Sequence, residues 1–244
     1  MSDSDQLDGP PEAAGPKAKL RAFGVALGLT VAAFVASVLA VVGVIGVSIP
    51  LGYDPADPPL LALFVAGQLG FLLAGYLYAR RYGLAIPLGL PDRRDARYVI
   101  GGTLAALAFA TVAAVGLEAA GLVPESPVEA LVTEEPTLAI WLAVLSILVV
   151  APAEEYLFRG VVQGRLRQTF GAPAAIGLAS LLFGSLHLGN FVGSFATVIA
   201  WTLLITGVGV ILGVLYERTG TLSVPIAVHA AYNAVLFLTG YLTL

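Results

Sequence analysis

The chain has 244 residues, of which 58% are hydrophobic and 11% are charged. A water-soluble domain carries roughly 25% charged residues. This composition, with a mean hydropathy of +0.92, therefore excludes an ordinary soluble domain and indicates an integral membrane protein. The 12 Lys and Arg residues form no basic stripe and the net charge is −4, so we expect no nucleic-acid partner. The absence of Cys excludes disulfides, thiolate metal sites and Cys nucleophiles.

The chain begins with a polar, acidic segment that is rich in Pro and Gly. Such a segment cannot bury enough apolar surface to offset the entropy cost of ordering. We expect a disordered acidic tail over residues 1–18. The tail lacks the basic start and the short apolar core of a cleaved secretory signal.

Seven apolar stretches follow the tail, and each except the fifth approaches or exceeds the ~20 residues that a membrane-spanning helix needs. They cover approximately residues 22–51, 58–79, 98–123, 136–153, 171–186, 188–216 and 219–244. We therefore predict an all-α, polytopic transmembrane helical bundle of about seven spans.

The basic residues test this number of spans independently, because cytoplasmic loops carry the excess of Lys and Arg. With the N-terminus in the cytoplasm, seven spans place all 12 cations on one side of the bundle or just inside that interface. The loops on the other side carry acidic residues and no cation. The pattern predicts a cytoplasmic N-terminus, and the acidic tail without a targeting segment is typical of a multi-pass protein of a prokaryotic plasma membrane.

Several ionisable side chains lie at or inside the predicted spans, where each costs ~3 kcal/mol on insertion scales and usually marks a functional site. Glu154 and Glu155 follow the fourth span, and Arg159 lies one turn later. The chain has two histidines, and His187 ends the fifth span whereas His229 lies early in the seventh. Taken singly, these residues also fit structural roles, as an interfacial salt bridge and as histidines hydrogen-bonded to neighbouring helices.

Helix geometry gives the two glutamates different roles, because adjacent side chains diverge by ~100° and cannot both point at one target. Glu155 and Arg159 stand at i and i+4, in the order that favours an ion pair, so we expect Arg159 to neutralise Glu155. Glu154 then faces a cavity, where a partly desolvated carboxylate that holds a water can act as a general base. Pro152 should kink the helix just upstream.

Two further residues lie one helical turn from the histidines. Asn233 follows His229 by four residues and shares its helix face, so it is the simplest partner for that imidazole. Phe183 precedes His187 by four residues and either forms an apolar wall beside it or packs as an ordinary core residue. Polar groups on three different apolar helices can thus converge on one site.

Three motifs in this region resemble those of one family of membrane enzymes. Residues 154–159 match E-E-x-x-x-R, residues 183–187 match F-x-x-x-H and residues 229–233 match H-x-x-x-N. In this order and at these separations they are similar to the motifs of the CAAX protease and bacteriocin-processing family, which includes the Rce1-type prenyl-protein proteases. The resemblance covers about residues 142–238, and the first three spans carry no motif.

The resemblance implies an intramembrane endopeptidase without a cofactor, which cuts a membrane-associated protein or peptide in a cavity open to cytoplasm and lipid. It implies that Glu154 activates the hydrolytic water and that Glu155 and Arg159 orient the site. The two histidines would hold the water or polarise the scissile carbonyl, and Asn233 would stabilise the oxyanion. These donors and acceptors are what amide hydrolysis needs.

On this resemblance the chain divides into the tail, motif-free N-terminal helices over 19–135 and a protease core over 136–244. Many relatives are drawn with eight spans, so eight remains the alternative to seven. The two histidines lie at different depths if the fifth span starts at the inner surface. We therefore predict that residues 161–170 run along the interface and that the fifth helix is short, tilted or begins within the membrane.

Four other functions remain open at this point. The family's historical label is metalloprotease, and Glu154, His187 and His229 have the residue types of a zinc site with one water, although no H-E-x-x-H occurs. A rhomboid-like serine protease would use Ser185, which lies two residues from His187 and lacks a G-x-S-G setting. A transporter would use intramembrane carboxylates to relay protons, and a non-catalytic scaffold would hold a partner in the bilayer.

Overall fold

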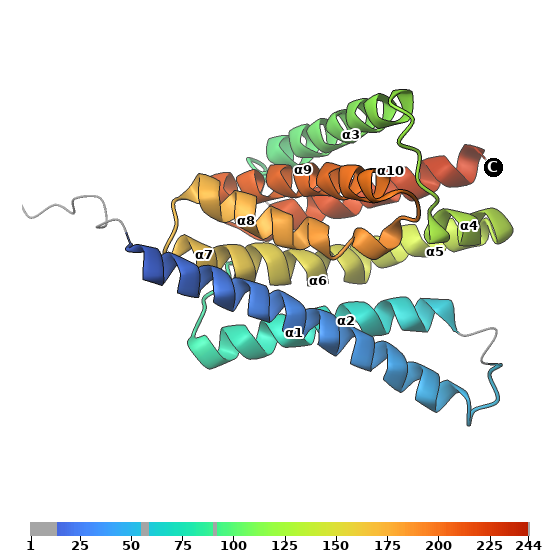
Figure 1. The fold of residues 1–244 in the computed structure, drawn as a ribbon, viewed down its shortest axis with the longest axis horizontal. Coiled ribbons are helices and arrows are strands. Elements are labelled where there is room, and N and C mark those ends of the chain that lie inside the picture. Colours follow the sequence, from blue (N-terminus) through green and yellow to red (C-terminus); the bar gives the residue numbers. More distant parts are fainter. Residues whose placement is uncertain (1–13, 55–58, 90–91, 244) are drawn as a thin grey trace, which may run out of the picture.

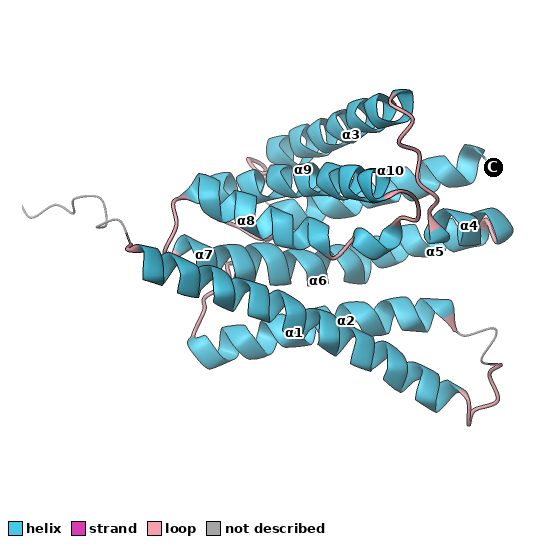
Figure 2. Ribbon diagram, in the orientation of Figure 1, coloured by secondary structure: helices cyan, strands magenta, loops and turns pink. Residues whose placement is uncertain are grey.

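The computed structural model describes residues 14–54, 59–89 and 92–243. Apart from one isolated bridge between Glu125 and Val192, these residues form helices and loops without a strand (Figure 2). Seven helices in the described part are long and apolar enough to cross a membrane, which confirms the predicted all-α multi-pass bundle. Residues 1–13 of the expected tail lie outside the described residues, and α1 begins at Pro16.

The spans follow the predicted apolar stretches closely. Six of them are α1 (Pro16–Ser48), α2 (Leu60–Tyr82), α3 (Ala96–Ala119), α8 (Ala172–Ser185) extended by the 3-10 turn η3 (Leu188–Asn190), α9 (Phe195–Thr219) and α10 (Ser223–Thr243). The fourth span is a continuous helix over Thr137–Arg167, called the central helix below. A short helix α4 (Pro127–Glu134), which the sequence analysis did not anticipate, precedes it and is capped by the Ser126 side chain.

The central helix contains two π-helical segments. Its parts are α5 (Thr137–Leu145), η1 (Ser146–Val150), α6 (Ala151–Glu155), η2 (Tyr156–Gln163) and α7 (Gly164–Arg167). Pro152 has no N–H to donate, and the wider turn of η1 immediately before α6 accommodates that missing hydrogen bond. π-Helical turns inside α-helices are frequent at functional sites.

The fifth span is short, as predicted, because α8 has only 14 residues. The accompanying prediction of an interfacial segment over residues 161–170 is wrong, since residues up to Arg167 continue the central helix. That segment was predicted in order to bring the two histidines to one depth, but polar side chains toward the end of the central helix face the protein interior. Arg159 and Gln163 are completely buried.

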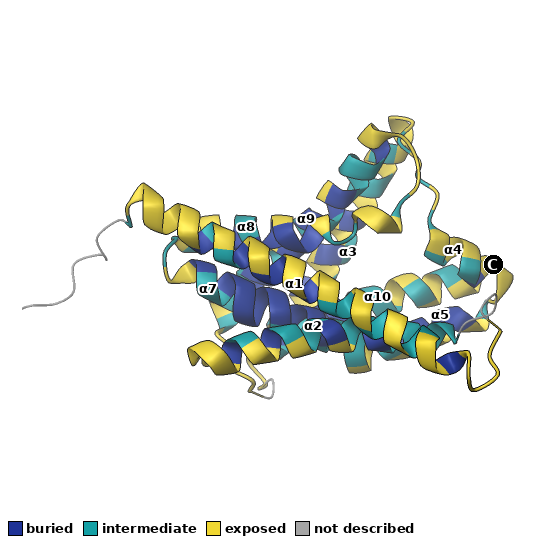
Figure 3. Ribbon diagram, turned by 60° about the horizontal axis from the view of Figure 1, so that its bottom comes forward, coloured by how far each residue is buried: buried dark blue, intermediate teal, exposed yellow. Residues whose placement is uncertain are grey.

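The central helix lies in the middle of the bundle and is surrounded by the other spans (Figure 1). On one side it packs against α1 and α2, and on the other against α8, α9 and α10. Helix α3 packs outside α9 and α10. Over the most apolar 18 residues of each span, 44% of the residues are buried in the central helix and in α9, compared with 17% in α2 and in α3. The buried residues are therefore concentrated in the middle of the bundle (Figure 3).

The basic helix ends gather at one end of the bundle. Helices α1 and α3 begin there with Lys and Arg, and α2, α7 and α9 end there with Arg. In Figure 1 this is the end at which α7 lies. The opposite end carries the acidic loops around α4. This separation agrees with the charge pattern in the sequence, and the cytoplasmic location of the N-terminus remains a prediction.

Glycines allow α9 to approach the centre of the bundle. A Cβ atom on Gly209 would lie 3.1 Å from Phe183 Cδ1 and 3.4 Å from Arg159 Nη2. A Cβ atom on Gly213 would lie 2.9 Å from Oε1 of the buried Gln163. The G-x-x-x-G spacing in α9 therefore does serve close helix packing.

Gly70 makes the closest backbone approach between α1 and α2, and we expect Gly70→Ala to destabilise the protein. The new Cβ atom would lie 2.5 Å from Ser37 Cα and 2.6 Å from Ser37 N, and backbone atoms cannot move aside as a flexible side chain can. We expect a loss of about 1–3 kcal/mol from overpacking, seen as a lower Tm of the detergent-purified protein. Gly43→Ala is the matched control, because a Cβ there meets no atom within 4 Å. Equal Tm values for the two variants would contradict the prediction.

Candidate active site

The centre of the candidate site is a buried ion pair on the central helix. Arg159 Nε lies 3.0 Å from Glu155 Oε2, and both side chains are 0% exposed. The sequence predicted this pair from its i, i+4 spacing. Two charges this deeply buried are tolerated only when each has a partner, because removing either would leave the other desolvated and unpaired.

His229 on α10 is the second partner of Glu155. Its Nδ1 lies 2.9 Å from Glu155 Oε1. A carboxylate only accepts hydrogen bonds, so Nδ1 carries the proton and donates. The alternative structural role of His229, a pairing with Asn233, is not seen, and the half-buried Asn233 side chain makes no hydrogen bond within the part of the chain that the structure describes.

Glu154 has one carboxylate oxygen held and the other unpaired. Gln68 on α2 donates from Nε2 to Glu154 Oε1 over 3.0 Å. Glu154 Oε2 is buried and has no hydrogen-bond partner among the described residues, and it lies 3.9 Å from His229 Nε2. A distance of this size between two polar atoms suits a water that bridges them. The expectation that the two glutamates cannot share a target is wrong, since both lie within 4 Å of the His229 ring.

Phe183 on α8 contacts both histidine rings. Its ring centroid lies 4.8 Å from that of His187 and 5.9 Å from that of His229. It also packs edge-on against Phe158 at 5.3 Å, and Arg159 Cζ lies over its face at 5.1 Å. Phe183 therefore forms an apolar wall beside the ion pair. The sequence suggested that the two histidines lie at different depths, but both of their rings lie next to Phe183.

His187 is oriented by the helix that it ends. Its Nδ1 donates to the Phe183 carbonyl over 3.0 Å, a local bond one turn back along α8. In the described residues it makes no hydrogen bond or ion pair with either glutamate. The structure thus brings Glu154, Glu155, Arg159 and His229 into direct contact, places His187 against Phe183, and leaves Asn233 one turn beyond His229.

The structure assembles neither the zinc site nor the serine–histidine pair that the sequence left open. Among the residues that the structure describes, no group of three or more His, Cys, Asp or Glu side chains could hold a metal ion, so the set of Glu154, His187 and His229 does not fit zinc as it stands. Ser185 Oγ donates to the Leu182 carbonyl over 2.8 Å instead of to a histidine.

The sequence analysis missed Gln68, because the first three spans carry no motif. The available signal was an amide side chain in the middle of the apolar helix α2, where polar groups need a partner. It also missed the contact of the Arg159 guanidinium with the Phe183 ring, which joins residues from two helices.

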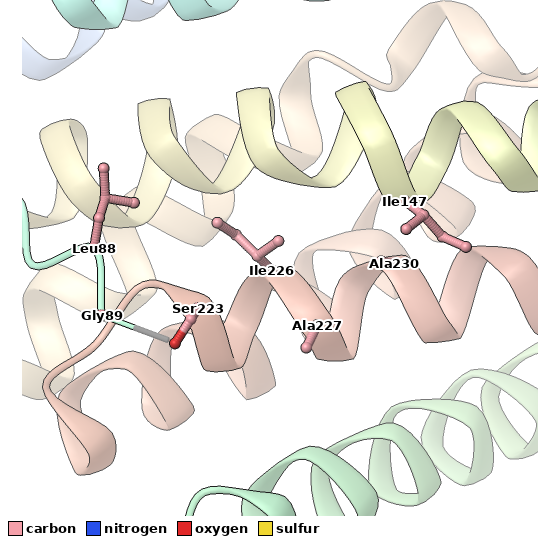
Figure 4. Close-up of a pocket in the computed structure, with 7 residues that line it drawn as sticks. All are labelled: Leu88, Gly89, Ile147, Ser223, Ile226, Ala227 and Ala230. Carbon is pink, nitrogen blue, oxygen red and sulfur yellow. The ribbon is translucent and has the colours of Figure 1, made fainter. Parts of the chain in front are cut away.

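An apolar cavity of about 400 Å³ lies on the same side of α10 as the central helix (Figure 4). Ser223, Ile226, Ala227 and Ala230 line it from α10, Ile147 lines it from η1, and Leu88 and Gly89 line it from the segment after α2. It contains none of the motif residues, although Ala230 is the chain neighbour of His229. The cavity is therefore adjacent to the candidate site and separate from it.

Comparisons with known proteins agree with the resemblance seen in the motifs. Residues 136–235 match the family described as type II CAAX prenyl endopeptidase Rce1-like. The chain is also similar to a protein of Bacillus subtilis (strain 168) titled uncharacterized protein YpbD, with 37% identity over 90 residues. That alignment covers 36% of this chain and 40% of the relative, so the chain spans less than half of the relative's length. No solved structure matches.

We expect Arg159→Met to destabilise the protein far more than Arg167→Met. Arg159→Met leaves Glu155 buried without its countercharge, which costs about 3–5 kcal/mol. Arg167 forms an ion pair with Glu217 of the same 3.0 Å length, but its side chain is 39% exposed, so the loss should be at most about 1 kcal/mol. Thermal unfolding of both purified variants measures the difference. Equal falls in Tm would show that burial of the Glu155 pair does not determine stability.

Proposed function

Because residues 136–235 match the Rce1-like family, we propose that the protein is an intramembrane endopeptidase of the CAAX type. Residues 136–244 would form its protease core. The basic end of the bundle would face the cytoplasm of a prokaryotic cell, in the plasma membrane. The observation that carries the proposal is the 3.9 Å separation between the unpaired Glu154 Oε2 and His229 Nε2.

The first step of the proposed reaction is activation of a water by Glu154. With its proton on Nδ1, neutral His229 presents Nε2 as an acceptor, and Glu154 Oε2 is a second acceptor. One water can donate to both, which directs its oxygen lone pair away from them and toward a substrate carbonyl. Glu154 takes one proton of the water as the oxygen attacks the carbonyl carbon.

The second step is collapse of the tetrahedral intermediate. The C–N bond breaks, and Glu154 returns the proton to the leaving amine, so the carboxylate is regenerated. Asn233 and His187 are the remaining polar groups of the motifs. The Asn233 amide would donate to the oxyanion, and His187 would donate from Nε2 as the imidazolium, because its Nδ1 proton is already given to the Phe183 carbonyl. Neither has its hydrogen-bonding capacity used by the two glutamates.

Glu155 and Arg159 would position the reacting groups without touching substrate. Glu155 fixes the tautomer and the orientation of His229 through Nδ1, in the way that a carboxylate orients a catalytic histidine. Arg159 compensates the charge of Glu155, so that Glu155 remains an acceptor in an apolar surrounding. This division leaves Glu154 as the one carboxylate that can exchange a proton with water.

The proposed substrate is a membrane-associated protein or peptide whose C-terminal segment reaches the basic end of the bundle. The matched family is described as a type II CAAX prenyl endopeptidase, which suggests a prenylated CAAX sequence as the substrate. An internally quenched peptide ending in a farnesylated CAAX sequence is therefore the first probe, together with the same peptide without the farnesyl group. Comparison of the membrane proteomes of wild-type and deletion strains would identify natural substrates.

We expect Glu154→Gln to reduce cleavage of the farnesylated peptide by at least about 100-fold, because an amide cannot take a proton from water. Binding of the peptide should persist, since the side-chain volume is unchanged. Glu134→Gln, at an exposed position on α4, and Ser185→Ala are controls that should retain activity. Cleavage by Glu154→Gln at the wild-type rate would overturn the proposal. Failure of the wild type to cut any peptide or membrane protein would favour the scaffold or transporter.

We further expect cleavage to persist in the presence of a strong zinc chelator. A catalytic zinc site uses about three protein ligands and an open position, and among the described residues no three His, Asp or Glu side chains are placed to hold one metal ion. Metal analysis of the purified protein should give well below one zinc per chain. Loss of activity on chelation, restored by added zinc, would instead establish the metalloprotease with Glu154, His187 and His229 as its ligands.

A further inference from the structure

Gln68 is a polar residue in the middle of the apolar span α2, and it lies outside the segment that matches the family. An amide inside a span costs free energy unless it forms hydrogen bonds. Its Nε2 donates to Glu154 Oε1 over 3.0 Å, which joins two residues that are 86 positions apart in the sequence. The residue is therefore directed at the carboxylate to which the proposed function assigns the proton transfer.

The packing of α2 holds Gln68 in this place. Helix α2 contacts α6 and both π-helical segments of the central helix. Gly75 lies two turns after Gln68 on the same helix face, and a Cβ atom there would lie 3.2 Å from Tyr156 Cδ1. On its other side α2 is fixed by the backbone approach of Gly70 to Ser37. Close contacts on both sides leave α2 little freedom to move the amide away from Glu154.

The hydrogen bond of Gln68 determines which way the Glu154 carboxylate turns. It occupies Oε1 and leaves Oε2 directed toward His229 Nε2 at 3.9 Å. Without this donor the carboxylate could rotate, and neither oxygen would be fixed at the distance that one bridging water requires. No other described residue donates a hydrogen bond to Glu154.

We propose that Gln68 is a positioning residue of the reaction, which aims Glu154 at the hydrolytic water. The inference rests on the proposed function and extends it, because the second span then supplies a part of the site that the matched segment lacks. The Oε1 atom of Gln68 is buried and has no hydrogen-bond partner among the described residues. It gives the site an additional acceptor beside Glu154.

The test is Gln68→Met, which keeps the length of the side chain and removes the donor. Loss of one hydrogen bond to a charged group should lower kcat for the farnesylated peptide about 10- to 100-fold. KM should stay within about 3-fold of the wild-type value, because Gln68 acts on Glu154 and does not bind substrate.

Gln163→Met is the control for loss of a hydrogen-bonding glutamine inside the bundle. Gln163 is completely buried in the central helix, whereas Gln68 is half-buried, and it donates to Glu217 Oε1 and to the Gly213 carbonyl, away from Glu154. We expect this variant to have a lower Tm and a retained kcat for the folded fraction. A kcat that falls equally in both variants would make the effect of Gln68 merely structural and would overturn the inference.

The outcomes separate this inference from the proposed function. If the wild type cleaves the peptide, Glu154→Gln does not, and Gln68→Met has the wild-type kcat, the inference fails and the protease stands. A rise in KM at constant kcat also overturns it, because Gln68 would then bind substrate. If Glu154→Gln cleaves as the wild type does, the proposed function itself fails.

Discussion

The structure depends on the burial of one ion pair in an apolar bundle. Glu155 and Arg159 are both fully buried, so their charges must be satisfied by protein groups alone. His229 supplies a hydrogen bond to Glu155 beside the ion pair, and the Phe183 ring covers the guanidinium. Satisfying this pair draws α8 and α10 to the central helix, and these two helices also bring both histidines to the same place.

Satisfying the ion pair requires close helix packing around it. The absence of a side chain at Gly209 lets α9 lie against Phe183 and Arg159, and the π-helical turns widen the central helix on both sides of α6. The apolar perimeter formed by α1 and α3 is mostly exposed in the isolated protein and is suited to contact with lipid (Figure 3). Polar groups at the centre are thus shielded from both water and lipid. In such a shielded interior, hydrogen bonds and charges act most strongly.

The sequence predicted the parts of this arrangement that depend on local spacing. The spans follow from apolar runs, and the Glu155–Arg159 pair follows from one helical turn. Contacts between distant residues were not predictable in the same way: His229 pairs with Glu155 across 74 positions, whereas spacing alone offered only its local neighbour Asn233 as a partner. The central helix was predicted too short, because the apolar run ends near residue 153 whereas the helix continues to Arg167 with Arg159 and Gln163 facing inward.

Helices without a motif can also contribute to a site, because contacts between distant residues need no local sequence pattern. A motif records residues whose chemistry is constrained at a fixed spacing, and here it covers the central helix, α8 and α10. A positioning group needs only one hydrogen-bond donor at the correct place, and an otherwise apolar helix can supply it without any local pattern. Glu154 receives its only described hydrogen bond from such a helix, since Gln68 stands in α2. The geometry of the candidate site therefore depends on packing between the matched segment and helices that the motifs do not describe, and a core of residues 136–244 alone would lack that donor.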